Sequence, residues 1–245
     1  MGRVRFDVIS TGSHGNAVVI EDNILIDCGV PYRVLADKIK SFKIVLLTHI
    51  HGDHFNKATI GRLAKLRPML RFGVPEHLVV DVLRAGVSEA RVDVLFTNVR
   101  YDYGSFAVEA VDLPHNVPQV GYKLFFADGR KMIYATDTSS LNGVKAADFD
   151  LYMIEANHGE EEIHDRIKQK ALDGKYAYEI EAAKNHLSEE KALDWIYGNI
   201  GAGGEYVLLH RHQEKGYGKR KDDSERRQLP CDTGMDGDGA WTKGK

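Results

Sequence analysis

Short apolar segments separated by polar turns organise the N-terminal part of the chain. Hydrophobic and polar positions alternate over residues 4–8, which predicts a strand. Residues 17–20 and 24–27 flank a polar turn and predict a β-hairpin. Residues 43–47 are continuously apolar, as in a strand buried on both faces, and residues 56–66 then have helical spacing. The pattern predicts strands that are covered by helices.

The second half of the chain repeats this arrangement. Strands are predicted over residues 106–111, 122–126, 131–135, 151–154 and 206–209. Asp128 and Gly129 separate the second of these strands from the third, and an Asp-Gly pair suits a type I′ hairpin turn. A helix is expected to begin near Ser188, because serine is a good N-cap and two glutamates follow it in the first turn.

Polar side chains that can bind metal repeatedly follow these apolar strands. His49, Asp137 and His210 each stand just beyond the end of a predicted strand. A rigid sheet can aim side chains in such positions at one place. Two strand-rich halves with helices between them predict an α/β fold, an αββα sandwich with the sheets inside and the helices outside.

The composition changes near the C-terminus. From residue 213 the chain mixes charges of both signs without an apolar face, and residues 232–245 are rich in Gly and Asp. Such a segment buries too little apolar surface to offset the entropy lost on ordering. We therefore expect one catalytic domain over residues 1–212 and a disordered tail over residues 213–245.

Composition and charge narrow the class of protein. The chain of 245 residues is 43% hydrophobic and 28% charged, as in an ordinary globular protein. Its net charge of −3 excludes a strongly basic protein that coats nucleic acid, but not a nucleic-acid enzyme. No apolar run approaches the ~20 residues that span a bilayer, and no signal-peptide core follows Met1. Two cysteines, Cys28 and Cys231, make no disulfide framework, so we expect a cytoplasmic protein without a membrane partner.

The segment His49-Ile50-His51-Gly52-Asp53-His54 carries four metal-binding side chains in six residues. In an extended chain His49 and His51 share a face and can reach one ion together. Gly52 lets the backbone turn, so that Asp53 and His54 can address a neighbouring ion. Imidazole and carboxylate ligands suit zinc, manganese or iron. The alternative is a solvated polar loop before a helix, which the density of ligands directly after a buried strand disfavours.

This motif, His-X-His-X-Asp-His after a strand, resembles the signature of the metallo-β-lactamase superfamily. The resemblance implies four further residues, each of which has a candidate in the expected order. An early Asp at a strand end matches Asp27, and a third histidine matches His115. A bridging Asp matches Asp137, and a final histidine matches His210, for which His212 is a local competitor.

Three further segments resemble the compact YycJ/WalJ-type exonucleases, single-domain relatives of RNase Z and RNase J. They are residues 11–16 (Thr-Gly-Ser-His-Gly-Asn), 155–158 (Glu-Ala-Asn-His) and 185–188 (Asn-His-Leu-Ser). The match covers approximately residues 4–212. Cys28, His14 and the pair Arg211-His212 depart from the pattern, where small or polar residues are more usual, and they leave the substrate open.

The resemblance implies a two-metal hydrolysis with assigned roles. One ion, Zn or Mn, would be held by His49, His51 and His115, the other by Asp53, His54 and His210, with Asp137 as the bridge. Asp53 would also orient the attacking hydroxide, and His186 would bind the phosphate or protonate the leaving oxygen. Asp27 is expected behind the ligands, bonded to the loop or to a ligand histidine.

Other histidines are open to a structural interpretation. His158 can act at the site or simply order its loop by hydrogen bonds. His77 and His164 are expected on the surface.

Three classes of function remain on the sequence alone. The first is an exonuclease, acting on DNA in preference to RNA. The second is a small-molecule hydrolase that uses the same metals on a thioester, lactone or β-lactam, because one fold hosts both chemistries. The run around His186 favours the nuclease. The third, a non-catalytic metal-binding protein, is disfavoured by the complete set of candidate ligands.

Overall fold

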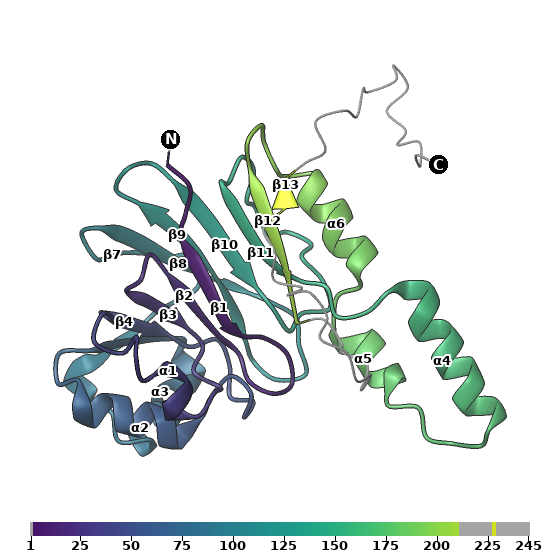
Figure 1. The fold of residues 1–245 in the computed structure, drawn as a ribbon, viewed down its shortest axis with the longest axis horizontal. Helices are drawn as coiled ribbons and strands as arrows, with labels where there is room; N and C mark the ends of the chain where they lie inside the picture. The colour runs from purple at the N-terminus through teal and green to yellow at the C-terminus, as the bar shows by residue number, and fades with distance from the viewer. Residues whose placement is uncertain (1, 211–226, 229–245) are drawn as a thin grey trace.

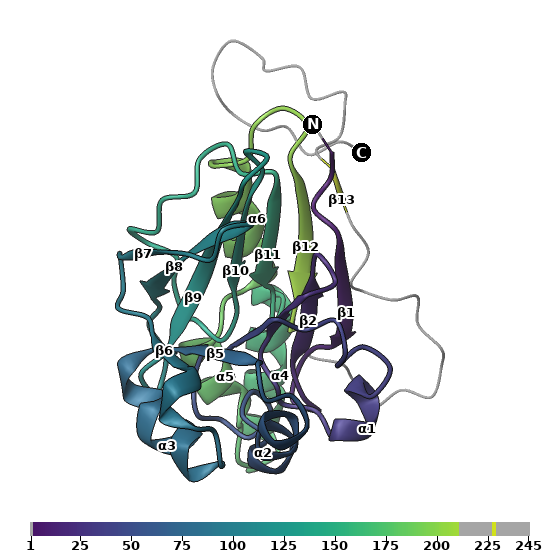
Figure 2. The same cartoon turned by 90° about the vertical axis from the view of Figure 1, so that its left-hand side faces the viewer.

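The computed structural model describes residues 2–210 and 227–228. Within these residues two β-sheets pack face to face between two layers of helices (Figure 1). The helices of the N-terminal half face the viewer when the molecule is turned by 90°, and α6 lies behind the sheets (Figure 2). This arrangement confirms the predicted αββα sandwich.

The first sheet has six strands in the order β1-β2-β3-β4-β5-β6. They are β1 (Phe6–Ser10), β2 (Ala17–Ile20), β3 (Ile24–Ile26), β4 (Ile44–Leu46), β5 (Arg71–Val74) and β6 (Val92–Val94). Strands β3 to β6 run parallel, and the connections between them are crossovers that contain helices. These helices are α1 (Tyr32–Leu35), α2 (Lys57–Leu66) and α3 (Val79–Arg84), with short 3₁₀ turns at Glu76–Leu78 and Glu89–Arg91.

The second sheet has seven strands in the order β13-β12-β11-β10-β9-β8-β7. They are β7 (Arg100–Asp102), β8 (Phe106–Asp112), β9 (Val120–Phe126), β10 (Lys131–Ala135), β11 (Leu151–Glu155), β12 (Glu205–Leu209) and β13 (Arg227–Gln228). Strands β10, β11 and β12 are parallel. Helices α4 (Glu160–Leu172), α5 (Glu179–Asn185) and α6 (Glu189–Tyr197) all lie between β11 and β12 in the chain.

Successive side chains of the central strands enter different apolar layers. Ile44 and Leu46 of β4 pack between the two sheets, whereas Val45 packs against the helices. In β10, Met132 points between the sheets and Ile133 points to the outer face, towards α6. Both faces of these strands are therefore buried, which explains why their sequences are continuously apolar rather than alternating.

Two helices begin at polar caps, and the cap at Ser188 is the one that the sequence predicts. The side chain of Asn56 accepts a hydrogen bond from the backbone N–H of Thr59 at the start of α2. Ser188 accepts one from the N–H of Lys191 at the start of α6. Each cap satisfies a backbone donor that the first helical turn leaves unpaired.

The turn between β9 and β10 differs from the predicted type I′ turn. That type needs a positive φ at both central residues. Here only Gly129 has one, with φ of 91°, whereas Asp128 does not. The N–H of Gly129 bonds to the carbonyl of Phe126, so an ordinary turn over residues 126–129 is followed by a left-handed glycine.

The predicted tail lies mostly outside the described residues. Arg227 and Gln228 are described, and they form β13, which pairs antiparallel with Tyr206 and Glu205 of β12. The boundary at residue 212 stays a prediction, but these two residues belong to the sheet rather than to a separate tail. Among the described residues, no helix is long and apolar enough to cross a membrane.

The candidate ligands gather at one edge because of strand direction. Asp27, His49, Asp137 and His210 follow the parallel strands β3, β4, β10 and β12, and parallel strands present their carboxyl ends at the same edge. Strand β8 points the same way as β10, since both are antiparallel to β9, and His115 follows it.

Candidate metal centre

Three histidine nitrogens converge at the first part of the site. His49 Nε2 lies 3.0 Å from His51 Nδ1, and His115 Nε2 lies 3.3 Å from the same atom. His49 is fully buried, while His51 and His115 are partly exposed. Three nitrogens this close, supplied by the loops after β4 and β8, form a set of donors that one ion can share.

The other ring nitrogens of His49 and His115 are held from behind. His49 Nδ1 lies 3.0 Å from Thr48 Oγ1, whose hydroxyl donates to Asp27 Oδ1 at 2.9 Å. His115 Nδ1 lies 3.3 Å from the carbonyl oxygen of Asn185. Because one nitrogen of each ring is engaged behind the site, the other is directed into it.

His54 and Asp137 form the next part of the site. His54 Nδ1 lies 2.7 Å from Asp27 Oδ2, which Tyr134 also contacts through its hydroxyl at 3.1 Å. Asp27 therefore fulfils its expected role behind a candidate ligand. On the other side of the ring, Nε2 lies 2.9 Å from Asp137 Oδ2. His49, His54 and Asp137 form a second cluster of donors, all of them buried.

Glu155, His186 and His210 complete the site around the other oxygen of Asp137. His210 Nδ1 lies 3.3 Å from Asp137 Oδ1 and 3.0 Å from Glu155 Oε1. His186 Nδ1 lies 2.5 Å from the same oxygen of Glu155. Asp137 is the residue common to this cluster and the cluster of His49 and His54.

Backbone strain concentrates in the site. Asp27, Asp137 and His210 have φ values of 60°, 54° and 53°, in the left-handed region that non-glycine residues rarely adopt. Asp27 and His210 directly follow β3 and β12, and Asp137 stands two residues after the end of β10. Such conformations cost about 1–3 kcal/mol and persist where the surroundings impose them. Here the strain turns each side chain sharply off its strand and towards the site.

The pKa shifts of the site histidines show how charge is balanced in the buried site. Burial lowers the pKa of His49 to about 2 and also lowers the pKa of His115, so both rings are neutral at pH 7 and able to bind metal. Burial opposes charge on His54 as well, but the carboxylates of Asp137 and Asp27 raise its pKa well above the ordinary value. Asp137 and Glu155 likewise raise the pKa of His210 against the effect of burial.

The donor set fits divalent cations. Asp137 Oδ2 is buried and makes no hydrogen bond within the described residues, although His54 Nε2 lies close to it. Ring nitrogens of His49, His51 and His115 converge on one position, and the buried carboxylates next to it require positive charge. Protons on His54 and His210 can supply that charge, and bound cations would replace them.

Asp53 is set apart from the other predicted ligands. Its Oδ2 lies 3.8 Å from His54 Nε2, and 26% of its side chain is exposed. It is not among the tightly clustered donors that contain the other six predicted ligands. The structure therefore brings together His49, His51, His54, His115, Asp137 and His210, and it leaves Asp53 at the rim.

Two contributors were missed by the sequence analysis. Glu155 is fully buried and bonds to both His186 and His210. Its position at the end of a buried strand was the available signal, the same one that marked Asp137. Gln119 donates from its amide to the carbonyls of Thr136 and Asp137, a role that no local motif indicates.

The histidines that were not assigned as ligands differ in how exposed they are. His77 and His164 are exposed, as predicted. His158 is half-buried, and its backbone pairs with Ser188 at the entry to α6. His212, the competitor for the last ligand, lies outside the described residues.

Comparison with known proteins assigns the family. The model of the Beta-lactamase superfamily domain matches residues 22–203. Ribonuclease Z of Clostridium beijerinckii is 28% identical over an alignment of 123 positions, which covers 42% of this chain and 40% of that protein. The chain thus matches less than half of that relative's length.

Solved structures show the same fold at low identity. The metallo-β-lactamase fold protein YhfI from Bacillus subtilis is 17% identical, with a TM-score of 0.64 over 86% of this chain and 87% of that chain. The short form of human tRNase Z is 18% identical, with a TM-score of 0.67 over 92% of this chain and 99% of that chain.

The fold and the clustered ligands thus define a protein of the metal-dependent hydrolase class. The chain belongs to the Beta-lactamase superfamily. The narrower resemblance to YycJ/WalJ-type exonucleases stays a prediction.

Proposed function

We propose that this protein is a metal-dependent phosphodiesterase that cleaves nucleic acid. The observation that carries the proposal is the pair His186 and Glu155 beside the candidate metal donors. A phosphodiester leaving group departs as an alkoxide and needs a proton. The pair places a proton donor next to the site where the phosphate would be attacked.

The cations would be held by residues that the structure clusters. His49, His51 and His115 would hold one ion, His54 and His210 would hold the other, and Asp137 would contact both. Zinc and manganese suit this mixture of nitrogen and oxygen donors. When bound, such a pair of cations supplies Lewis acidity, which makes water nucleophilic near neutral pH and stabilises charge on the phosphate.

The chain's own side chains position the nucleophile and the proton. Asp53 lies at the exposed rim, where its carboxylate can accept a hydrogen bond from the attacking water and orient it. Glu155 accepts a hydrogen bond from Nδ1 of His186, so Nε2 is the atom that can give a proton to the leaving oxygen. Glu155 is itself fixed by the N–H of Thr138 at 2.7 Å.

The choice of nucleic acid rests on names of similar proteins. Ribonuclease Z and tRNase Z act, by name, on RNA. The sequence on its own leads to the expectation of an exonuclease that acts on DNA in preference to RNA. We propose RNA as the first substrate to test, with exonucleolytic cleavage of DNA as the second.

A substrate panel tests the proposal. Purified protein with manganese or zinc is offered 5′-phosphorylated single- and double-stranded RNA and DNA, together with a β-lactam, a lactone and a thioester. We expect cleavage of a nucleic acid that His51→Ala abolishes and His164→Ala, at an exposed histidine of α4, does not affect. Turnover of a small molecule without cleavage of any nucleic acid would refute the proposal in favour of the small-molecule hydrolase.

A further inference from the structure

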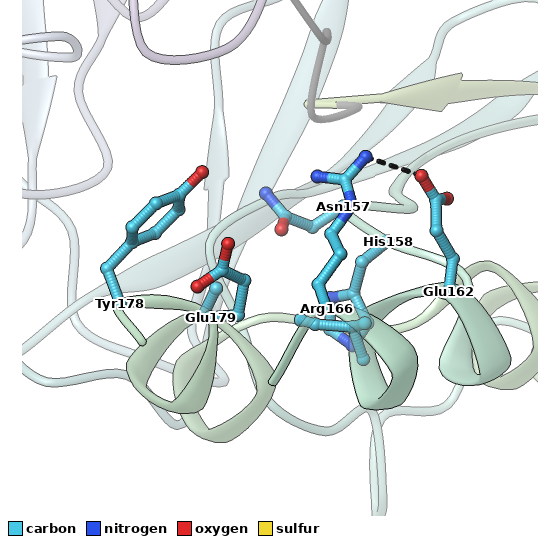
Figure 3. A pocket seen from close by; sticks show the side chains of 8 residues that line it. Asn157, His158, Glu162, Arg166, Tyr178 and Glu179 are labelled. Atoms are coloured by element: carbon cyan, nitrogen blue, oxygen red, sulfur yellow. Dashed lines mark hydrogen bonds and ion pairs between the residues drawn. The ribbon is translucent and has the colours of Figure 1, made fainter. Parts of the chain in front are cut away.

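A pocket opens between α4, α5 and the loop that follows β11 (Figure 3). Asn157 and His158 border it from the loop, Arg166 borders it from α4, and Tyr178 borders it at the start of α5. The polar ends of Asn157, Arg166 and Tyr178 lie on the same side of the two helices (Figure 3). The pocket has room for about three water molecules.

The pocket adjoins the candidate metal centre. Asn157 stands two residues after Glu155, and its Nδ2 donates to the backbone carbonyl of His210 at 3.1 Å. Helix α5, which forms one wall, ends at Asn185, directly before His186. A group bound in the pocket would therefore lie next to the residues that would act on the phosphodiester.

The charges around the pocket disfavour a phosphate as its occupant. Arg166 is already paired with Glu162 at 2.5 Å. Glu179, a second carboxylate in the wall, is 2.7 Å from Lys170. Each cation is matched by an acid, so a phosphate entering the pocket would meet two carboxylates without an excess of positive charge. An uncharged ligand does not meet this repulsion.

The side chains instead suit an uncharged heteroaromatic ring. The ring of Tyr178 lines the pocket and is 49% exposed. Lys170 Nζ lies 3.9 Å from the ring centroid and covers part of one face, so a base would contact the part of the ring that faces the pocket. Amide, carboxylate and guanidinium groups are those that bind the edges of bases, and aromatic rings stack on their faces. The Nδ1 of His158 is buried and has no hydrogen-bond partner within the described residues, so it adds a further polar group.

We propose that this pocket binds one base of the substrate strand and thereby places the adjacent phosphodiester at the metal centre. The proposal rests on the proposed nuclease function for its catalytic consequence. Binding of the base itself is independent of cleavage, and it can be measured separately.

The test compares two tyrosines of the same segment. Tyr178→Leu removes the ring from the pocket, Tyr178→Phe keeps it, and Tyr176→Leu removes a ring that is 80% exposed and does not line the pocket. We expect Tyr178→Leu to lower kcat/KM on oligonucleotides about 5- to 100-fold, the usual effect of losing one base stack. Tyr178→Phe and Tyr176→Leu should stay within about twofold of the wild type.

The substrate provides the matching change. When the substrate lacks the base next to the cleaved bond, the kcat/KM of the wild type should fall by the same factor. The kcat/KM of Tyr178→Leu should fall no further on this substrate. Hydrolysis of bis(p-nitrophenyl) phosphate, which carries no base, should not show the Tyr178-dependent loss. Equal losses on both substrates, or a lowered melting temperature that accounts for the loss, would overturn the proposal.

Nucleoside binding separates this proposal from the nuclease function. Uridine and adenosine, titrated into the zinc-loaded protein and followed by NMR, should bind the wild type and Tyr178→Phe at least fivefold more tightly than Tyr178→Leu. Failure of both nucleosides to bind the wild type, or displacement of them by inorganic phosphate alone, would contradict the base pocket even in an active nuclease. Tyr178-dependent binding by a protein that cleaves no nucleic acid would support the pocket and refute the nuclease.

Discussion

Asp137 occupies the point where two groups of donors meet. One of its oxygens lies 2.9 Å from His54 Nε2 and the other lies 3.3 Å from His210 Nδ1. Burial disfavours the ionised carboxyl, but His54 and His210 hold the pKa of Asp137 well below its usual range. A single carboxylate can thus contact two cations on opposite sides.

Removal of this carboxylate should lower the metal content. We expect the purified wild type to carry close to two ions per chain and Asp137→Ala to lose at least one, because the carboxylate would serve both. Asp148→Ala is the control, since Asp148 also has a left-handed backbone, with φ of 56°, and lies outside the cluster. Elemental analysis gives the result. Full occupancy in Asp137→Ala would remove Asp137 from the bridging position.

His186 can be tested through the leaving group. If it gives the proton, His186→Ala should keep the fold and the metals and lose ~10²–10⁴-fold in kcat on a nucleic acid. The loss should shrink on a nitrophenyl phosphodiester, whose leaving group needs no proton. His164→Ala, at an exposed histidine of α4, is the matched control. Equal losses on both substrates would favour phosphate binding over proton donation, and loss of a metal ion would make His186 a ligand.

At the scale of elements, the connection before β9 supports the end of β10. The amide of Gln119 donates to the carbonyls of Thr136 and Asp137. Successive carbonyls point in opposite directions in a strand and in a similar direction in a left-handed or helical turn. One amide can reach both only because Asp137 leaves the strand conformation. Gln119 is buried, so it stabilises the strained backbone that directs Asp137 into the site.

Gln119→Leu should therefore affect stability and metal binding together. The substitution keeps similar volume but leaves two backbone carbonyls without this donor, at a cost of about 1–3 kcal/mol. We expect a lower melting temperature and weaker metal binding, both followed by calorimetry. Gln169→Leu changes an exposed glutamine of α4 and should alter neither. Metal affinity that is unchanged in Gln119→Leu would show that Asp137 keeps its orientation without this contact.

On the scale of the whole molecule, the two sheets are joined by packing and by a polar link. The central apolar layer unites residues from both sheets, among them Leu46 and Met132. Beyond this layer, Arg130 of the β9–β10 turn lies 2.5 Å from Glu21 in the β2–β3 turn and donates to the carbonyl of Arg3 at 2.7 Å. Both charged side chains of the pair are mostly buried.

The link predicts a pH-dependent stability. Burial opposes ionisation of Glu21, but hydrogen bonds from Arg5 and Arg130 lower its pKa below the ordinary value of 4.5. Its contribution should be complete above pH 4.5 and should disappear as the pH falls through the lower folded pKa. We expect Glu21→Gln to destabilise the protein by about 1–3 kcal/mol at pH 7 and progressively less below pH 4.5, measured by urea unfolding. Asp22→Asn, at the exposed neighbour, should have little effect. A Glu21→Gln penalty that is constant down to pH 3 would contradict the assignment.

Features that depend on neighbouring residues could be predicted from the sequence. The apolar runs 43–47, 131–135 and 151–154 became strands because both of their faces are buried. Ser188 marked a helix start because a cap bonds to a backbone N–H three residues away. The segment 49–54 indicated metal chemistry because its ligands are adjacent in the chain. The turn at Asp128 was mispredicted, since the pair of residues alone does not set φ.

The tertiary structure decided which distant groups meet. Glu155, His186 and His210 come from a strand end, a helix end and a second strand end, and the parallel pairing of β11 with β12 brings them within hydrogen-bonding range. The bonds of Gln119 and the pocket between α4 and α5 depend in the same way on how elements pack. Such contacts cannot be predicted from a single sequence, because the spacing of residues along the chain does not determine them. They depend on how the crossovers connect the strands and on the register in which the strands pair.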